Sequence, residues 1–169
     1  MILDSRSEFC NATSVVLTQG ASWQNIGDVY DRQAVSGFSA APGNVTVDLG
    51  KGQPIYLVIR VTTGVIAAGN GSIAFRLVSD TSDNPPNASS ATIHWTSASY
   101  STTTANPSAN LPAGTLVVAM ALPMSSYERY LGVQALVSTQ NTTAGAIDAF
   151  LTLDYSAVRH YVNAIDSTT

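Results

Sequence analysis

Two histidines, His94 and His160, are the side chains of this chain that could act as a general base near neutral pH. Acyl transfer by a serine needs a nucleophile, a base and an orienting acid together. Residues 37–41 (Gly-Phe-Ser-Ala-Ala) begin like a nucleophile elbow, but they lack its final glycine and its strand-to-helix context. His94 stands beside Trp95 on a predicted strand, where we expect a hydrogen-bonded structural imidazole. The sequence therefore predicts no catalytic residue and no enzyme.

Metal-binding chemistry has an equally sparse basis. Asp80, Asp83 and Asn84 could offer oxygen ligands to a calcium ion, but their spacing matches no calcium-binding loop, which favours an ordinary solvated loop. The single cysteine, Cys10, can form neither an intramolecular disulfide nor a metal cage. We predict no metal site and no cofactor, and we expect the fold to depend on an apolar core.

Aromatic side chains are the remaining lead to a binding site. Trp23, Tyr30, Trp95 and Tyr100 could form a platform on which sugar rings stack, although filling a core is the usual role of such residues. A carbohydrate-binding jelly-roll module is therefore kept as the alternative function.

Charged residues make up 11% of the chain, with a net charge of -4 and a pI near 4.8. A surface built from uncharged polar groups suits a partner that is held by shape, hydrogen bonds and apolar contact. The seven basic residues form no cluster, so we predict no nucleic-acid partner. The longest strongly apolar run, 55–61, is too short for a membrane span. The first eight residues have acidic residues early and no long apolar stretch, so they predict no secretory signal.

Residues 130–138 and 146–154 show the clearest periodicity in the chain. Apolar residues alternate along both runs, which is typical of half-buried antiparallel strands, and the six residues between them predict a β-hairpin. Leu136 and Phe150 fall among polar residues on the opposite face. We expect them to form either a second layer of the sandwich or a self-association surface.

Further short runs with strand character lie at 14–18, 72–79, 91–97 and 116–122, and 45–49 with 55–61 predicts a second hairpin. Residues 19–43 mix glycines with aromatic residues and predict a long packed loop. The pattern predicts an all-β, jelly-roll-like two-sheet sandwich of about eight antiparallel strands, with other β-sandwiches as the runner-up. We divide the chain into an N-terminal arm (1–13), the sandwich domain (14–154) and a C-terminal arm (155–169), which is either a short helix or extended.

Several motifs occur in the same order as in a known family. They are Met-Ile-Leu-Asp at 1–4 with Phe9, Gln-Pro-Ile-Tyr-Leu-Val at 53–58, Leu-Pro-Ala-Gly at 111–114, Glu-Arg-Tyr-Leu at 128–131, and Thr-Ala-Gly at 143–145 through Phe-Leu-Thr-Leu-Asp at 150–154. With them the chain resembles the capsid cement, or decoration, proteins of tailed bacteriophages over most of its length. Residues 19–43 and 99–108 depart from the family pattern.

The resemblance implies a non-enzymatic jelly-roll-like protein of the virion, made in the host cytoplasm. It would bind the outer surface of the capsid, bridge neighbouring major capsid protein subunits, and act as a homodimer. A small sandwich reaches a neighbour most easily with its termini, although these arms could instead fold back on their own domain. The candidate shell contacts are Met1, Ile2, Leu3, Phe9, Trp23, Tyr30, Tyr155, Val158, Tyr161 and Ile165.

Overall fold

The computed structural model describes residues 8–20, 22–32, 54–83, 85, 91–102 and 111–154. All regular secondary structure in these ranges is β-strand, which confirms the predicted all-β class. No helix in the same ranges has the length and hydropathy needed to cross a membrane. The strands are β1 (Glu8–Ser14), β2 (Gln24–Asn25), β3 (Tyr30–Asp31), β4 (Tyr56–Ala67), β5 (Ser72–Asp80), β6 (Thr92–Thr96), β7 (Tyr100–Ser101), β8 (Leu116–Ala121), β9 (Tyr130–Ser138) and β10 (Thr142–Thr152).

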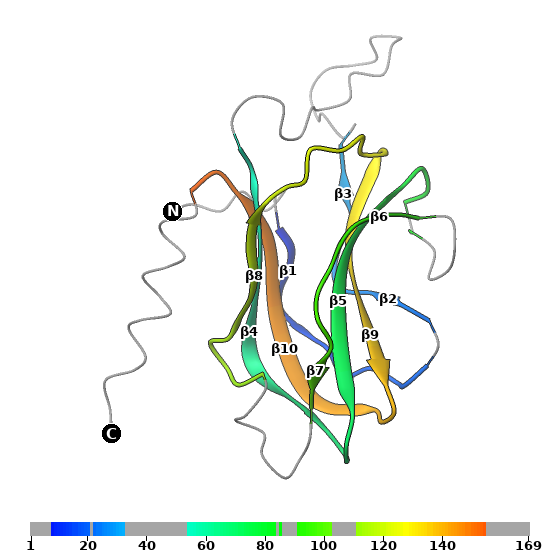
Figure 1. Ribbon diagram of the computed structural model, residues 1–169, viewed down its shortest axis with the longest axis vertical. Coiled ribbons are helices and arrows are strands. Elements are labelled where there is room, and N and C mark those ends of the chain that lie inside the picture. Colours follow the sequence, from blue (N-terminus) through cyan, green and yellow to red (C-terminus); the bar gives the residue numbers. More distant parts are fainter. Residues whose placement is uncertain are drawn as a thin grey trace.

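The strands form two antiparallel sheets that face each other (Figure 1). One sheet has the order β1-β10-β4-β8, and the other has β2-β9-β5-β6, with β3 also beside β9 and β7 also beside β5. β2 with β3 can be counted as one interrupted strand, and so can β6 with β7, which gives eight strands. These eight pair in a nested order: β1 with β10, β2 and β3 with β9, β4 with β8, and β5 with β6 and β7. This is the jelly-roll plan, and the predicted two-sheet sandwich is confirmed.

The predicted hairpin between residues 130–138 and 146–154 is wrong. Strand β9 pairs with β5, β2 and β3, whereas β10 pairs with β1 and β4, so the chain passes from one sheet to the other after Ser138. Thr139 has a positive φ of 73° in this sharp connection. Apolar residues alternate in the same way along strands that lie side by side and along strands that face each other across a core, so the pattern alone could not separate the two arrangements.

The connection from β4 to β5 crosses between the sheets in the same way. Its backbone lies against the connection from β9 to β10, because the amide of Ala68 donates to the carbonyl of Asn141 at 3.4 Å. The predicted strand 55–61 is the beginning of β4, and its proposed hairpin partner, 45–49, lies outside the described residues. Both crossings therefore meet at one end of the sandwich.

The core lies between the sheets and consists of side chains that alternate inward along each strand. Leu57 and Ile59 from β4, Phe75 from β5 and Ile147 from β10 are completely buried. Full burial of such a side chain stabilises the folded state by about 1.5–3 kcal/mol. These strands form the packed support that holds the outward-facing residues and sheet edges in position.

Strand β1 consists mostly of residues that we assigned to the N-terminal arm, 1–13. It pairs with β10 and forms one edge of the four-stranded sheet. Phe9 is only 2% exposed and belongs to the core, so its assignment as a surface contact is corrected. The pairing satisfies backbone groups of β10 that a detached arm would leave open, and it buries an aromatic side chain at the same time.

Gly27 lies between β2 and β3 of one sheet and is packed against β1 of the other sheet. It has a positive φ of 69°, and the next amide, of Asp28, donates to the carbonyl of Phe9 at 2.6 Å. A Cβ atom at position 27 would overlap that carbonyl group and the side chain of Cys10. The absence of a side chain is therefore required both for the backbone conformation and for the close approach.

We expect Gly27→Ala to lower the free energy of unfolding by about 2 kcal/mol or more, because it adds backbone strain to a steric overlap. Gly20→Ala is the matched control, since a Cβ there would meet nothing closer than the amide nitrogen of Ser22 at 3.9 Å. The control should change stability by less than about 0.5 kcal/mol. Urea denaturation measures both values, and equal effects would contradict the assigned role of Gly27.

Candidate functional site

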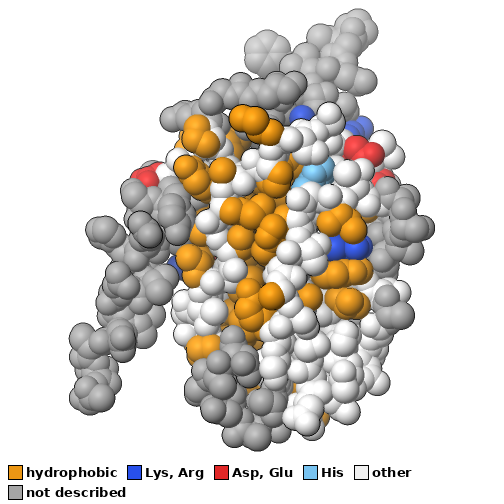
Figure 2. Space-filling view, viewed as in Figure 1, with side chains coloured by type: hydrophobic (Ala, Val, Ile, Leu, Met, Phe, Trp, Pro, Cys, Tyr) orange, Lys and Arg blue, Asp and Glu red, His pale blue; other side chains and the backbone are white. Residues whose placement is uncertain are grey.

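One side of the sandwich combines apolar side chains with a strand, β8, that has a neighbour on one side only among the described strands. β8 ends one sheet and β6 ends the other, and the hydroxyl of Tyr100 in β7 donates to the carbonyl of Val117 in β8 at 3.5 Å. Trp95, Val118 and Met120 are half-buried along these strands. Figure 2 shows hydrophobic side chains gathered in a column on this side of the molecule. We call these five residues the open side.

Strand β8 carries no charged side chain, since its sequence is Leu-Val-Val-Ala-Met-Ala. It pairs with β4, and beyond its end the amide of Leu122 donates to the carbonyl of Ile55 at 2.8 Å. Hydrogen-bonding direction alternates along a strand, so Ala119 and Ala121 direct their backbone groups away from β4. An edge of this kind can accept the backbone of another extended segment.

His94 is half-buried and belongs to a polar cluster. The hydroxyl of Ser79 is 2.8 Å from His94 Nε2, and it also donates to Glu128 Oε2 at 3.4 Å and accepts from the backbone amide of Glu128 at 3.1 Å. The carboxylate thus contacts the serine and not the imidazole, and Ser79 is completely buried. The arrangement therefore differs from a nucleophile, base and acid relay, and it ties β5 and β6 to the segment before β9.

The remaining contacts of His94 are aromatic and electrostatic. Its ring lies 4.2 Å from that of Tyr127, whose hydroxyl donates to the carbonyl of Pro123 at 2.6 Å. Burial lowers the pKa of His94, and the positive charge of Arg32 lowers that pKa further. Burial also raises the pKa of Tyr127 to about 12. Both rings are therefore held in their uncharged forms.

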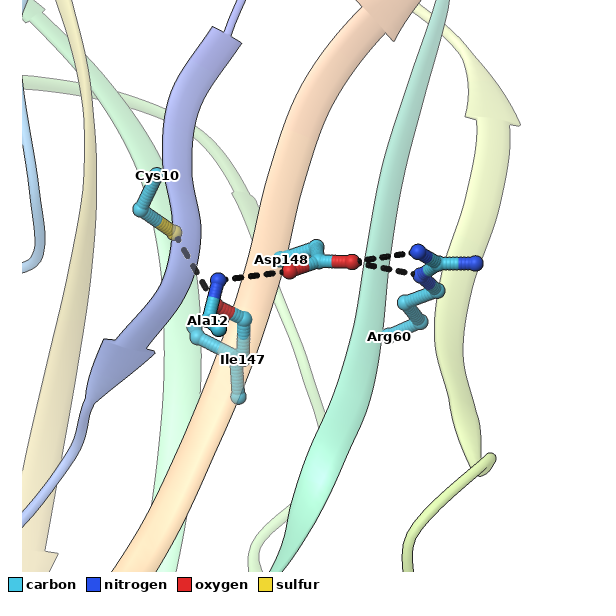
Figure 3. A network of polar contacts seen from close by, with 5 residues as sticks. All are labelled: Cys10, Ala12, Arg60, Ile147 and Asp148. Atoms are coloured by element: carbon cyan, nitrogen blue, oxygen red, sulfur yellow. Dashed lines mark hydrogen bonds and ion pairs between the residues drawn. The ribbon is translucent and has the colours of Figure 1, made fainter.

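A second polar network crosses three strands of the other sheet (Figure 3). Asp148 in β10 accepts from the backbone amide of Ala12 in β1 at 2.7 Å and from Arg60 Nε in β4 at 2.6 Å. The Asp148 side chain is 6% exposed and that of Arg60 is 41% exposed. Ala12 has a positive φ of 45° at an irregularity in the pairing of β1, so the carboxylate fixes the bulged backbone of that edge strand.

The other candidates for chemistry have structural contacts. The Cys10 thiol donates to the carbonyl of Ile147 at 3.6 Å, and burial raises its pKa to about 12, which keeps it protonated. Asp80 accepts from the backbone amide of Ser82 at 2.8 Å within its own loop. Across the described ranges, no three His, Cys, Asp or Glu side chains are grouped so that they could hold a metal ion.

The four aromatic residues considered for sugar stacking do not share one surface. The Trp23 ring lies against the guanidinium of Arg76, at 4.4 Å from ring centroid to Cζ, so one ring face is already occupied. Tyr30 is half-buried and packs against the core from β3. Trp95 and Tyr100 pack against the core at the open side. No continuous aromatic platform is formed by these four side chains.

Leu136 and Phe150, which we expected on one face of a hairpin, lie in different sheets. Leu136 in β9 is half-buried beside Ala74. Phe150 in β10 is 4% exposed and packs with Val58, and the partly buried Leu116 and Ala119 lie against this pair. The crossing after β9 separates the two residues, so they cannot belong to one sheet face.

The remaining candidate contacts are in parts of the chain that are not described. Met1, Ile2 and Leu3 precede the described residues, and the C-terminal candidates follow them. These C-terminal candidates are Tyr155, Val158, Tyr161 and Ile165. The assignment of both the N-terminal and the C-terminal candidates as shell contacts stays a prediction.

A comparison with protein-family models finds a match to Bbp16 over residues 14–151. The chain belongs to the Bbp16 family. No curated protein matches the sequence. The matched range begins at the last residue of β1 and ends one residue before the end of β10, so it spans nearly all of the jelly-roll domain of this Bbp16 family member.

Sequence reasoning missed the polar partners and the exposed edge. Alternation identified residues 116–122 as a strand, but an edge position depends on the order of strands in the sheet. Asp148 and Arg60 are 88 residues apart, and nothing in their local patterns links them. Arg76 lies within the predicted strand 72–79, and nothing in the local pattern there indicates its partners.

The lowered pKa of His94 predicts how stability depends on pH. Above the ordinary pKa of 6.5 the imidazole is neutral in both the folded and the unfolded chain, whereas below it the unfolded chain binds the proton more readily. The free energy of unfolding should therefore fall as the pH drops below 6.5, and less steeply in His94→Gln. Urea denaturation across this range measures the two slopes. Identical slopes would show that His94 does not couple folding to protonation.

The Asp148 network predicts a large loss on removing its carboxylate. We expect Asp148→Ala to lower the free energy of unfolding by about 2–4 kcal/mol, because the Ala12 amide and Arg60 lose their shared acceptor. Asp31→Ala is the control, since Asp31 pairs at 2.9 Å with Arg129, whose side chain is 43% exposed. It should cost about 1 kcal/mol or less. Chemical denaturation compares the two, and a larger loss for Asp31→Ala would contradict this ranking.

Proposed function

We propose that this protein is a capsid cement protein, which binds the outer surface of a tailed-bacteriophage shell and bridges neighbouring major capsid protein subunits. The observation that carries the proposal is the open side, where half-buried apolar residues and the uncharged edge of β8 lie together on a packed jelly-roll support. The ordered motifs that resemble cement proteins supply the identity of the partner.

The physical chemistry of the surface supports a contact of this kind. With 11% charged residues, the chain offers little electrostatic steering, so its binding depends on fitted apolar and hydrogen-bonded contacts. A strand edge supplies backbone donors and acceptors for one additional extended segment, whatever the side chains of that segment are. A coat protein that presents such a segment could be held without any ion pair.

Binding linkage explains how a small protein would strengthen a large shell. A protein that binds only the assembled shell stabilises it by about 2.7 kcal/mol per site when its free concentration is a hundred times Kd. This term repeats at every site. We propose that the protein acts as a homodimer, because two linked contacts bridge subunits where one contact would only coat them. The proposed location is the outer surface of the virion, and the proposed role needs neither a cofactor nor catalysis.

The test mixes the protein with expanded shells that lack cement protein. We expect the protein to sediment with the shells and to raise the temperature at which they release the genome, because it binds the assembled state alone. A protein that neither binds nor shifts the release temperature would overturn the proposed function.

A pair of variants tests which side makes the contact. Ile93 in β6, at the edge beside the open side, is 54% exposed, and Val16, after β1 near the opposite edge of the sandwich, is 53% exposed. Ile93→Lys should weaken shell binding at least about tenfold, or 1.4 kcal/mol, whereas Val16→Lys should bind as the unmodified protein does. If Val16→Lys is the weaker binder, the contact does not lie on the side of the sandwich that β6 borders.

A further inference from the structure

Arg76 is an almost fully buried cation on the outer face of the six-stranded sheet. It lies in β5, opposite Gln134 in β9 and Thr96 in β6. The residue is 7% exposed, and burial lowers its pKa, which reflects the cost of keeping this charge away from water. A guanidinium in such a place is usually matched by a carboxylate or by several carbonyl oxygens.

One edge of the guanidinium is fixed by a chain of amide groups. Arg76 Nε donates to Gln134 Oε1 at 2.8 Å. Gln134 is completely buried, and its Nε2 donates to Asn25 Oδ1 at 2.6 Å and to the carbonyl of Pro85 at 3.1 Å. Asn25 Nδ2 donates to the same carbonyl at 3.2 Å. The orientation of the Arg76 fork is therefore set by residues from β9, β2 and the segment after β5.

The other edge of the guanidinium carries its two terminal amino groups. Within the described ranges, the two terminal amino groups of Arg76 donate to no oxygen atom, although an arginine carries four N–H donors there. The other three described arginines each meet oxygen atoms. Arg60 binds Asp148, Arg129 binds Asp31, and Arg32 donates to the carbonyls of Tyr127 and Glu128.

Trp23 determines how a ligand could approach. The guanidinium lies over its ring, with Arg76 Cζ 4.4 Å from the ring centroid, so the indole occupies the space on that side of the cation. A ligand is left with the outer edge, which presents parallel N–H groups. This geometry matches the two oxygens of a carboxylate.

The surroundings favour a carboxylate that belongs to a protein. Ala74 and Val78 lie two residues before and two residues after Arg76 in β5. Half-buried Leu136 pairs with Ala74 and exposed Ile93 pairs with Val78, so apolar side chains flank the cation on both sides along the strand. Figure 2 shows a basic side chain framed by hydrophobic ones over this part of the sheet. Nucleic acid would need several cations, and the chain has seven basic residues against eleven acidic ones.

We propose that Arg76, held by Gln134 and Trp23, is a receptor for an aspartate or glutamate side chain of a partner protein. The carboxylate would take both terminal amino groups, and apolar residues beside it in the partner would cover Leu136 and Ile93. The inference goes beyond the proposed function, since it names the chemistry of a contact and holds whether or not the partner is a capsid.

The test uses the full-length protein and two capped tripeptides, Gly-Glu-Gly and Gly-Gln-Gly, followed by NMR at the Arg76 Nε–H and the Trp23 indole N–H. We expect saturable shifts with the glutamate peptide and at least tenfold weaker binding of the glutamine peptide. Sodium chloride at matched ionic strength should cause no saturable shift. Equal effects of the two peptides, or shifts that follow salt alone, would overturn the proposal, and so would tighter binding of inorganic phosphate.

Variants then locate the site. Arg76→Lys keeps the charge but loses the fork, and it should weaken glutamate-peptide binding at least tenfold. Arg129→Lys changes an exposed arginine elsewhere and should leave that binding unchanged. Unchanged binding by Arg76→Lys would overturn the assignment. If Arg76→Lys does not fold, the difference in binding between the two peptides, measured on the unmodified protein, decides the question. No shell is used in these measurements, so their result is independent of the proposed cement function.

Discussion

Strand β10 lies in the middle of its sheet, with β1 on one side and β4 on the other, and Asp148 is the residue at which all three are joined. Its carboxylate holds the amide of the bulged residue Ala12 and the guanidinium of Arg60. The nested order of a jelly roll requires the first described strand to pair with the last, so the sheet forms only when distant parts of the chain meet. The positions of the core, the open side and the outer faces all follow from this pairing.

The few charged residues have separate structural roles. Asp148 and Arg60 fix an edge strand, and Arg32 joins its own segment to the carbonyls before β9. The His94 cluster uses polar atoms to connect strands where an apolar contact would not specify one arrangement. Arg76 differs, because an amide oxygen accepts from its Nε, while no oxygen atom of the described residues accepts from its terminal amino groups. In a surface with so little charge, one oriented cation can contribute much of the specificity of a contact.

The open side and the Arg76 site lie on either side of β6. Trp95, opposite Leu77, packs toward the core at the open side, while Ile93, opposite Val78, is exposed on the outer face. The two proposed contacts, at the β8 edge and at Arg76, are therefore separated by the width of one strand. Both features lie on the sandwich, and the match to the Bbp16 family model, over residues 14–151, covers nearly all of the strands that support them.

The sequence by itself determined the strand class, the approximate number of strands and the low content of charge, because alternation and composition are read directly from the residues. It also indicated that His94 would be a hydrogen-bonded residue of a strand. Only the tertiary structure decided that β9 and β10 belong to different sheets, that Phe9 is buried, and that Leu136 and Phe150 lie apart. The position of β8 at the end of the described strands of its sheet, and the contacts of Arg76 with Gln134 and Trp23, were decided there too. The physical reason is that a period of two shows which side of a strand is apolar, whereas partners are chosen by contacts between residues far apart in the chain.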